Sequence, residues 1–294
     1  MKILDKNVIV EEIKNDLFES KKIKFFIKRE DLLHDIISGN KYRKLKYNIE
    51  EATKRYNKIL SFGGSYSNHL YALSYLGSIR GIKTIGAVRG DLNTEIMKYC
   101  QSNGMKIINL DYSKYRERNN KIYINYLREQ EGDFFYLPEG GTNELSVKGC
   151  EEILDKNCDC FDYICCAVGT GGTIAGLLRS AKKHQKIIGF SVLKKNKNII
   201  SNIFKYSNNN NFSLNNDYNF GGIGNYNDDL IMFMNTIFMN FNLRLDPIYN
   251  SKLFFGIFDL IEKNFFKKNS KILIINTGGL SGLSGFKDRK LIYV

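Results

Sequence analysis

The chain has no tryptophan, two prolines and three histidines among its 294 residues. It also lacks any apolar run near the roughly 20 residues that a membrane-spanning helix requires, so we expect no membrane segment. The N-terminal residues 1–6 are not followed by the apolar stretch of a secretory signal, and a cytoplasmic location is the default expectation. The six cysteines lack the spacing of zinc ligands, which together with the few histidines argues against a metal enzyme.

The net charge of +13 raises the question of nucleic-acid binding. The basic residues are dispersed along the chain, however, and neither an arginine-rich block nor a known nucleic-acid module is present. The abundant Lys, Asn, Ile, Phe and Tyr are residues of A/T-rich codons, so we attribute the charge mainly to genome composition. We therefore expect no nucleic-acid partner.

After Lys41 the sequence alternates short apolar runs with amphipathic stretches, which predicts an α/β protein with parallel sheets. The run Tyr163–Val168 is apolar almost throughout, as expected of a strand buried on both faces. Between residues 194 and 219 the pattern breaks at Asn208–Asn211, and this polar tract predicts a solvated surface connection. The predicted strands are 58–62, 83–89, 105–110, 134–137, 162–168, 186–193 and 271–275, and the predicted helices are 68–80, 94–103, a stretch ending at 154, 173–183, 228–240 and 251–263.

A glycine- and threonine-rich loop, Gly169-Thr170-Gly171-Gly172-Thr173, lies between a predicted strand and a predicted helix. Glycines let backbone amides approach an anion, the helix N-terminus adds partial positive charge, and the two threonine hydroxyls add donors. The loop is neither a P-loop, because no Lys-Ser/Thr pair follows, nor a dinucleotide fingerprint, because Ile174 replaces the third glycine. We predict a phosphate site here; the alternative is a tight turn that binds nothing.

Lys41 follows Ser38-Gly39-Asn40, a typical helix start, and so falls in the first turn of a predicted helix. This is an unfavourable place for a cation, and desolvation there would lower the lysine pKa and make the amine more nucleophilic. The alternative is one more surface lysine. A nucleophilic lysine and a distant phosphate loop together supply what pyridoxal phosphate requires, because the lysine forms the Schiff base and the loop holds the phosphate.

A third polar segment begins at Gly63-Gly64 and includes Ser67, Asn68 and His69. Its hydrogen-bonding side chains are suited to one wall of a small polar ligand site. The alternative is an ordinary helix N-cap by Ser67 or Asn68.

These segments, with Leu137–Asn143 and Thr277–Gly279, resemble the 1-aminocyclopropane-1-carboxylate deaminase/D-cysteine desulfhydrase family. This family is a branch of the fold type II, tryptophan synthase β-like enzymes that use pyridoxal 5'-phosphate. The resemblance covers nearly the whole chain and implies two open parallel-sheet α/β domains with the cofactor between them. The larger, cofactor-binding domain would comprise residues 1–47 and 151–294, and the smaller one residues 48–150. The resemblance also implies a small amino-acid substrate and a homodimer.

By position, Lys41 resembles the lysine that binds the cofactor, and Asn68 resembles the residue hydrogen-bonded to the phenolic oxygen of the cofactor. Ser67 and His69, together with Asn68, resemble the residues that meet the substrate carboxylate. Residues 169–173 resemble the phosphate loop.

Near the C-terminus, Asp246–Asn250 resembles a segment that brings a tyrosine, here Tyr249, to the substrate. It brings the next side chain, here Asn250, to the pyridine nitrogen of the cofactor. The resemblance thus implies Lys41, Ser67 and Tyr249 as the catalytic residues.

Three positions depart from the family pattern. Asn250 stands where the deaminases carry Glu and the desulfhydrases Thr, and a neutral amide cannot hold the pyridine nitrogen protonated as a carboxylate would. Asn250 therefore disfavours opening of a cyclopropane ring more than expulsion of a thiolate. Ile223 replaces a tyrosine of the catalytic site, with Tyr226 three residues further on, and Asn276 replaces a histidine that commonly precedes Thr-Gly-Gly.

The leading hypothesis is a pyridoxal-phosphate-dependent lyase that performs a D-cysteine desulfhydrase-like β-elimination, releasing pyruvate, ammonia and sulfide. Lys41 would shuttle the α-proton as general base. Ring-opening deamination of 1-aminocyclopropane-1-carboxylate is the second hypothesis. The alternative is a cofactor-binding paralogue with altered specificity or little catalysis, and a dinucleotide oxidoreductase is a more distant one.

Overall fold

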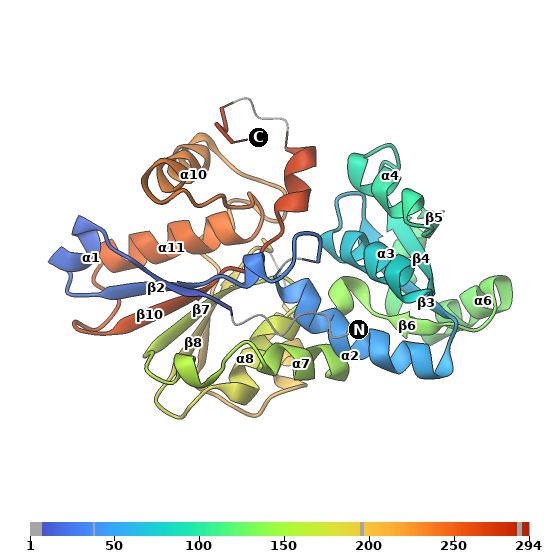
Figure 1. Cartoon of the computed structure of the whole chain (residues 1–294), viewed down its shortest axis with the longest axis horizontal. Helices are drawn as coiled ribbons and strands as arrows, with labels where there is room; N and C mark the ends of the chain where they lie inside the picture. Colours follow the sequence, from blue (N-terminus) through green and yellow to red (C-terminus); the bar gives the residue numbers. More distant parts are fainter. Residues whose placement is uncertain (1–7, 38, 195–196, 287–289, 294) are drawn as a thin grey trace.

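The computed structural model describes residues 8–37, 39–194, 197–286 and 290–293. The expectations for residues 1–6 and for Ser38 therefore lie outside the described residues. Figure 1 shows two α/β bodies side by side, one built on a six-stranded sheet and the other on a four-stranded sheet. The predicted α/β class with parallel-dominated sheets is confirmed.

The six-stranded sheet has the strand order β1-β2-β10-β7-β8-β9. All neighbouring pairs are parallel except β1 and β2, whose antiparallel pairing the sequence pattern did not reveal. Apolar residues of α1, α10 and α11 pack on one face, and those of α7, α8 and α9 on the other, which explains why β7 is buried at every residue. The strands are β1 (Val10–Ile13), β2 (Lys24–Lys28), β7 (Tyr163–Val168), β8 (Lys186–Ser191), β9 (Phe212–Asn215) and β10 (Lys271–Ile275).

The four-stranded sheet has the order β5-β4-β3-β6 and is parallel throughout. Apolar residues of α2, α3 and α4 cover one face, and those of α5 and α6 cover the other. Its strands are β3 (Lys58–Gly64), β4 (Lys83–Arg89), β5 (Lys106–Leu110) and β6 (Phe135–Leu137).

Most of the longer helices begin and end where local chemistry favours it. The side chain of Ser67 accepts a hydrogen bond from the Leu70 amide at the start of α3, and Gly81 ends this helix with φ of 64°. The structure describes the helices α1 (Asp16–Ser20), α2 (Asn40–Arg55), α3 (Asn68–Arg80), α4 (Glu95–Ser102), α5 (Tyr112–Arg116), α6 (Lys121–Glu131), α7 (Glu144–Glu151), α8 (Gly172–Ser180), α9 (Ile199–Phe204), α10 (Asp228–Phe241) and α11 (Asn250–Glu262), and the 3-10 turns η1 (Glu30–Leu32), η2 (Glu117–Asn119), η3 (Glu139–Gly141), η4 (Lys156–Cys158) and η5 (Leu280–Gly285). None of the helices described here is both long and apolar enough to cross a lipid bilayer.

The asparagine tract Asn208–Asn211 is a connection without helix or strand, in which Asn208 and Asn210 are exposed, as its composition predicts. The segment around it, residues 197–219, is more regular than the break in the sequence pattern suggests. This segment contains α9 and β9, and β9 extends the sheet by parallel pairing with β8. The asparagine tract is tied to the body, because Asn209 Nδ2 donates to the Leu178 carbonyl at 2.8 Å and Asn211 Nδ2 to the Gln185 carbonyl at 2.8 Å. The amides bond to main-chain carbonyls near the end of α8 and the start of β8, a use that composition alone does not reveal.

Elements near the predicted domain boundaries contact both bodies. Helix α2 contributes buried residues to the core of the four-stranded body and also packs against α7, which in turn packs against α8 of the other body. Figure 1 shows α2 between the two bodies. The division into residues 1–47 with 151–294 and residues 48–150 stays a prediction.

Candidate active site

The predicted site residues follow the carboxyl ends of strands from both sheets, where parallel α/β proteins bind their ligands. Gly169–Thr173 follows β7, Asn276–Gly279 follows β10, and Ser65–Asn68 follows β3. The N-terminus of α2 joins this edge directly, since Gly39 has φ of 63° and a Cβ there would lie 1.8 Å from the Thr277 carbonyl oxygen. Only glycine permits this approach, and it brings the next residues of α2 to the carboxyl end of β10.

Lys41 lies in the first turn of α2, as its position after Gly39 predicts. Its amine lies 3.2 Å from Asn40 Oδ1, and Asn40 Nδ2 donates to Thr173 Oγ1 at 2.9 Å, so Asn40 joins the lysine to the glycine loop. Burial, and then the charge of Lys44, lowers the pKa of Lys41 to about 7. Near neutral pH a large fraction of this amine is uncharged and able to attack a carbonyl carbon.

The glycine loop has the form of an anion cradle. Gly171 precedes α8 as its N-cap with φ of 90°, and no side-chain cap hydrogen bond is present at this helix start among the described residues. A Cβ at Gly172 would lie 2.9 Å from the Thr142 side chain and 3.2 Å from Lys44 Nζ. Donors thus converge on a helix N-terminus that no side chain caps, which is the arrangement that binds phosphate.

Lys44 is a site residue that the sequence reasoning missed. Its side chain is 2% exposed, and its ammonium donates to the Gly140 carbonyl at 3.1 Å, to Thr142 Oγ1 at 3.1 Å and to Thr170 Oγ1 at 3.3 Å. Burial lowers the pKa of Lys44, and no carboxylate in the described part of the chain forms an ion pair with it. A buried ammonium without a counterion favours an anion at this position. The available signal was the three-residue spacing from Lys41, which puts both amines on one face of a helix.

Ser67, Asn68 and His69 lie at the start of α3. The Ser67 hydroxyl caps this helix, which was the alternative to its predicted catalytic role, and Asn68 Oδ1 accepts a hydrogen bond of 2.5 Å from Ser281 of η5. His69 is buried, with Nε2 2.9 Å from Ser61 Oγ, and its Nδ1 has no hydrogen-bond partner in the part of the chain that the structure describes. Burial, and then the charges of Lys41 and Lys44, holds the pKa of His69 well below its usual value, so this imidazole is neutral and close to both amines.

Tyr249 and Asn250 lie where α11 begins. A Cβ at Gly169 would lie 3.2 Å from Tyr249 Cε1, so the tyrosine ring rests on the glycine loop. The buried Asn250 amide donates to Asp246 Oδ1 at 2.6 Å and to the Gly278 carbonyl at 2.8 Å, and its oxygen accepts from the Thr277 amide at 3.1 Å. Both N–H groups of this amide are therefore committed to the protein.

The carboxylate of Asp246, which accepts a hydrogen bond from the Asn250 side chain, also bonds to other groups of the protein. Asp246 is 2% exposed and accepts hydrogen bonds from the amides of Ile248, Tyr249 and Asn250. Burial raises the pKa of Asp246, while those hydrogen bonds oppose the rise. Asp246 thus fixes the start of α11, with Asn250 between it and the Gly278 carbonyl.

The three unusual positions differ in their surroundings. Ile223 and Tyr226 are 49% and 39% exposed, and the Tyr226 ring packs on Phe286 with centroids 4.6 Å apart. Asn276 is buried at the end of β10, where its Nδ2 has no partner among the described residues. Tyr226 therefore packs on the segment near the C-terminus.

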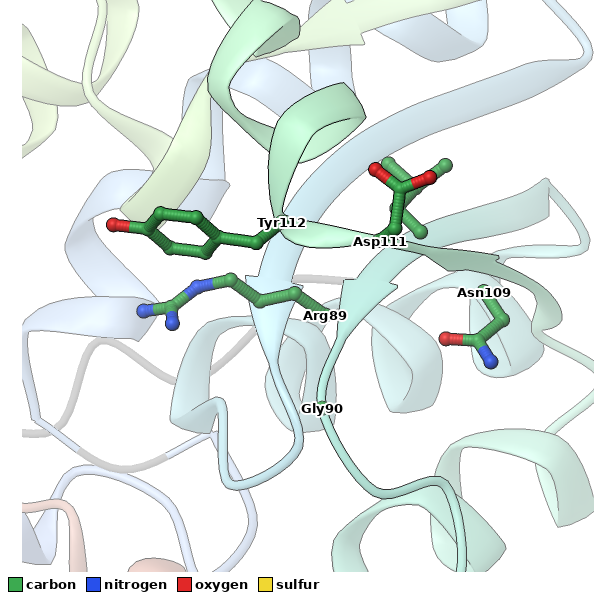
Figure 2. Close-up of a pocket in the computed structure, with 6 residues that line it drawn as sticks. Arg89, Gly90, Asn109, Asp111 and Tyr112 are labelled. Carbon is green, nitrogen blue, oxygen red and sulfur yellow. The ribbon is translucent and has the colours of Figure 1, made fainter.

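One cavity, of about 490 Å³, lies elsewhere, at the carboxyl ends of β4 and β5 (Figure 2). The Arg89 guanidinium lies 5.0 Å from the Tyr115 ring centre and 5.9 Å from that of Tyr112. None of the predicted site residues lines this cavity. The candidate site lies instead where the amines of Lys41 and Lys44 meet the start of α8. Among the described residues, no group of three His, Cys, Asp or Glu side chains is arranged to hold a metal ion.

Comparisons with known proteins agree with this geometry. A family model described as pyridoxal-phosphate dependent enzyme matches residues 13–278. A Thermotoga maritima protein named as a candidate 1-aminocyclopropane-1-carboxylate deaminase is 32% identical over 91% of this chain and 92% of its own length. A Klebsiella pneumoniae D-cysteine desulfhydrase is 24% identical over 89% of this chain and 88% of its own length. The crystal structure of an ACC deaminase homologue superimposes with a TM-score of 0.85 at 23% identity, covering 99% of this chain and 94% of that one.

The fold and the site define an α/β protein in which a desolvated lysine faces an anion cradle at the carboxyl edge of two sheets. The chain belongs to the pyridoxal-phosphate-dependent enzyme family, and among its relatives are 1-aminocyclopropane-1-carboxylate deaminase and D-cysteine desulfhydrase homologues. The fold type II assignment and the cofactor that the sequence motifs implied are thereby confirmed.

Proposed function

We propose that this protein is a pyridoxal-phosphate-dependent lyase that eliminates a β-substituent from a small amino acid, with D-cysteine as the representative substrate. The observation that carries the proposal is the pair of desolvated amines, Lys41 and Lys44, one helical turn apart beside the glycine loop. One amine is suited to bond to an aldehyde and the other to neutralise a phosphate, so the residues present fit the two ends of pyridoxal phosphate.

When bound, pyridoxal phosphate supplies an electron sink for negative charge at the α-carbon of an amino acid. Lys44 and the first amides of α8 would hold the phosphate, and Asn40 keeps the Lys41 amine beside this loop. Neutral Lys41 would accept the α-proton of the substrate, which its pKa of about 7 allows near neutral pH. The Cα–H bond and then the Cβ–S bond break, sulfide leaves, and water completes the release of pyruvate and ammonia.

The remaining predicted residues position the reactants. Ser67, Asn68 and His69 form the wall that receives the substrate carboxylate, and a neutral His69 can share a hydrogen bond there without competing for the α-proton. Tyr249 covers the glycine loop on the substrate side.

Asn250 favours elimination over ring opening. Its amide is neutral and both of its N–H groups are engaged by Asp246 and Gly278, so the position supplies no negative charge to a pyridine nitrogen. A weaker electron sink suffices when a thiolate leaves but serves poorly when a cyclopropane carbon must leave.

Two other functions keep specific support. The relative at 32% identity carries the name of the ring-opening enzyme, which favours 1-aminocyclopropane-1-carboxylate as a second candidate substrate. The exchanges at Ile223, Asn250 and Asn276 favour a cofactor-binding protein with altered specificity or little catalysis.

One titration separates these functions. Purified protein loaded with pyridoxal phosphate is titrated with D-cysteine, L-cysteine and 1-aminocyclopropane-1-carboxylate while absorbance, pyruvate, 2-oxobutyrate and sulfide are measured. We expect an absorbance band at the visible edge that Lys41→Ala removes, and equal amounts of pyruvate and sulfide from D-cysteine. A wild-type band with no product from any of the three would favour the non-catalytic alternative, and an unchanged band in Lys41→Ala would overturn the assignment of the lysine.

A further inference from the structure

A second buried lysine lies in the first turn of a helix beside the site. Lys252, two residues after Asn250, is 1% exposed, and its ammonium donates to the Asn219 carbonyl at 2.9 Å and to the Gly222 carbonyl at 2.6 Å. It forms no ion pair among the residues that the structure describes. A buried cation at the positive end of a helix is unfavourable, so the two carbonyls must offset both its desolvation and the helix dipole.

These two carbonyls belong to a strained double turn. The Gly222 amide donates to the Asn219 carbonyl at 2.9 Å and the Asn225 amide to the Gly222 carbonyl at 3.2 Å, so Lys252 bonds to the acceptor of each turn. Phe220 has φ of 51°, an uncommon conformation for a non-glycine residue, and Gly221, Gly222 and Gly224 also have positive φ. The double turn therefore depends on contacts from outside, and α11 supplies them through Lys252 and through the Phe255 ring, 5.0 Å from that of Phe220.

The double turn lies at the border of the site. On one side, a Cβ at Gly222 would lie 3.3 Å from the side chain of Lys194, which follows the carboxyl end of β8. On the other side, Tyr226 packs on Phe286, which directly follows η5. The same turn, η5, supplies Ser281 to Asn68. Residues 219–226 thus reach from the ligand-binding edge of the large sheet to the segment that contacts the start of α3.

We propose that Lys252 is a positioning residue whose ammonium clamps the loop 219–226 to the first turn of α11 and so sets how a substrate is held beside Lys41. The part that concerns substrate rests on the proposed function, whereas the clamp itself does not. Lys252 belongs to the same helical turn as Asn250. Its side chain therefore fixes the position of the loop 219–226 relative to the segment Tyr249–Asn250.

The protonation of Lys252 makes the clamp testable. Burial lowers the pKa of Lys252 to about 8, and the charge of Asp246 opposes this shift. Other titratable groups near the clamp include Tyr226 within the loop, Lys194 beside Gly222, and Tyr218, whose pKa is raised far from neutrality by burial and by Asp259. As the pH rises through about 8, Lys252 loses its charge progressively, and its hydrogen bonds to the two carbonyls weaken.

Because the chain has no tryptophan, Ile223→Trp places a single fluorescent reporter on the loop. In protein loaded with pyridoxal phosphate, we expect the emission of this reporter to titrate with a midpoint near pH 8. Lys252→Met should abolish the titration and give the high-pH emission throughout, whereas Lys252→Arg, charged at every pH, should give the low-pH emission throughout. A titration that persists in Lys252→Met, or its absence from the protein that retains Lys252, overturns the proposal.

Lys28→Met is the matched control. Lys28 is also fully buried in the large body, but its ammonium is paired with Asp155 at 2.6 Å. This variant should lose stability yet keep the reporter titration. Should Lys252→Met fail to fold, the Lys252→Arg variant and the titration of the parent still decide the question.

The kinetic part of the test separates positioning from a merely structural role. With D-cysteine or whichever substrate turns over, Lys252→Met should lower kcat/KM by about tenfold to hundredfold, the order expected when a positioning contact is lost. The cofactor absorbance band should remain, and Lys252→Arg should restore most of the activity at pH 9. If no amino acid turns over, the proposed function fails, while the reporter titration still tests the clamp independently.

Discussion

At the scale of single residues, the proposed function gives two neighbouring amines different roles toward one cofactor. Lys41 and Lys44 lie one turn apart on α2; burial lowers the pKa of both, and the charge of Lys44 lowers that of Lys41 further. Burial is the larger cause for both lysines. An anion at the glycine loop would compensate the buried charge of Lys44 and leave Lys41 as the nucleophile.

Replacing Lys44 with Met tests this division. We expect cofactor affinity to fall by about 10- to 100-fold, because a hydrogen bond to a charged group contributes about 1.5–3 kcal/mol. Loss of the Lys44 charge should also raise the pKa of Lys41, so the pH at which the apoprotein captures pyridoxal phosphate at half its maximal rate should move upward from about 7. Both quantities follow from the absorbance band during cofactor titration at several pH values.

Lys54→Gln is the control, since Lys54 lies on the same helix with its side chain 71% exposed. It should leave the affinity and the pH midpoint unchanged. Equal effects of the two variants would show that general loss of charge on α2, rather than the position of Lys44, is responsible.

At the scale of elements, the start of α2 determines where Lys41 lies. This helix begins at a glycine with positive φ instead of a side-chain cap, and the Asn40 amide lies 3.4 Å from the Thr277 carbonyl oxygen. The contact sets the N-terminus of α2 against the residues that follow β10. A helix usually begins where neighbouring residues cap it, but the start of α2 depends on Thr277, which lies more than 230 residues further along the chain.

Gly39→Ala should therefore destabilise the protein and displace Lys41. A Cβ at this position would lie 1.8 Å from the Thr277 carbonyl oxygen, whereas at Gly81, with φ of 64°, nothing lies within 4 Å. Comparison with Gly81→Ala thus controls for a positive φ at the mutated glycine. We expect Gly39→Ala to lower the free energy of unfolding by roughly 1–3 kcal/mol more than Gly81→Ala, as overpacking generally does. Denaturant titration measures this difference, and equal losses would mean that the Thr277 contact exerts no strain.

At the scale of the whole molecule, the site draws on both bodies. The glycine loop, Tyr249 and Asn250 belong to the six-stranded body, while Ser67, Asn68 and His69 begin a helix that packs on the four-stranded sheet. Helix α2 supplies both lysines and contacts both bodies. A homodimer stays a prediction, because the structure is that of a single chain.

Cofactor binding should consequently stabilise both bodies together. At a free concentration 100 times the Kd, pyridoxal phosphate adds about 2.7 kcal/mol to the free energy of unfolding and raises Tm accordingly. Hydrogen exchange should slow both at the start of α8 and at the start of α3. Inorganic phosphate is the comparison, since it should protect α8 alone; protection of only one body by pyridoxal phosphate would contradict a shared site.

The sequence by itself determined the features that local chemistry controls. Glycines, caps and apolar runs marked β3, α3, β4, β7 and β10 closely and put Lys41 in the first turn of a helix, because those signals lie within a few residues of their effect. It also placed the glycine loop between a strand and a helix, and the lysine and the loop together predicted the cofactor.

The tertiary structure decided what depends on residues far apart in the chain. The burial of Lys44 under Gly140 and Thr170, the locking of Asn250 by Gly278 and the clamp of Lys252 on Gly222 each join segments that the sequence leaves separate. The same is true of the asparagine tract that precedes β9, which packs against the body only because carbonyls of other elements lie within hydrogen-bond distance. Desolvation and hydrogen-bond partnership arise from packing, so the charge of a lysine and the freedom of an amide were fixed only when the chain folded.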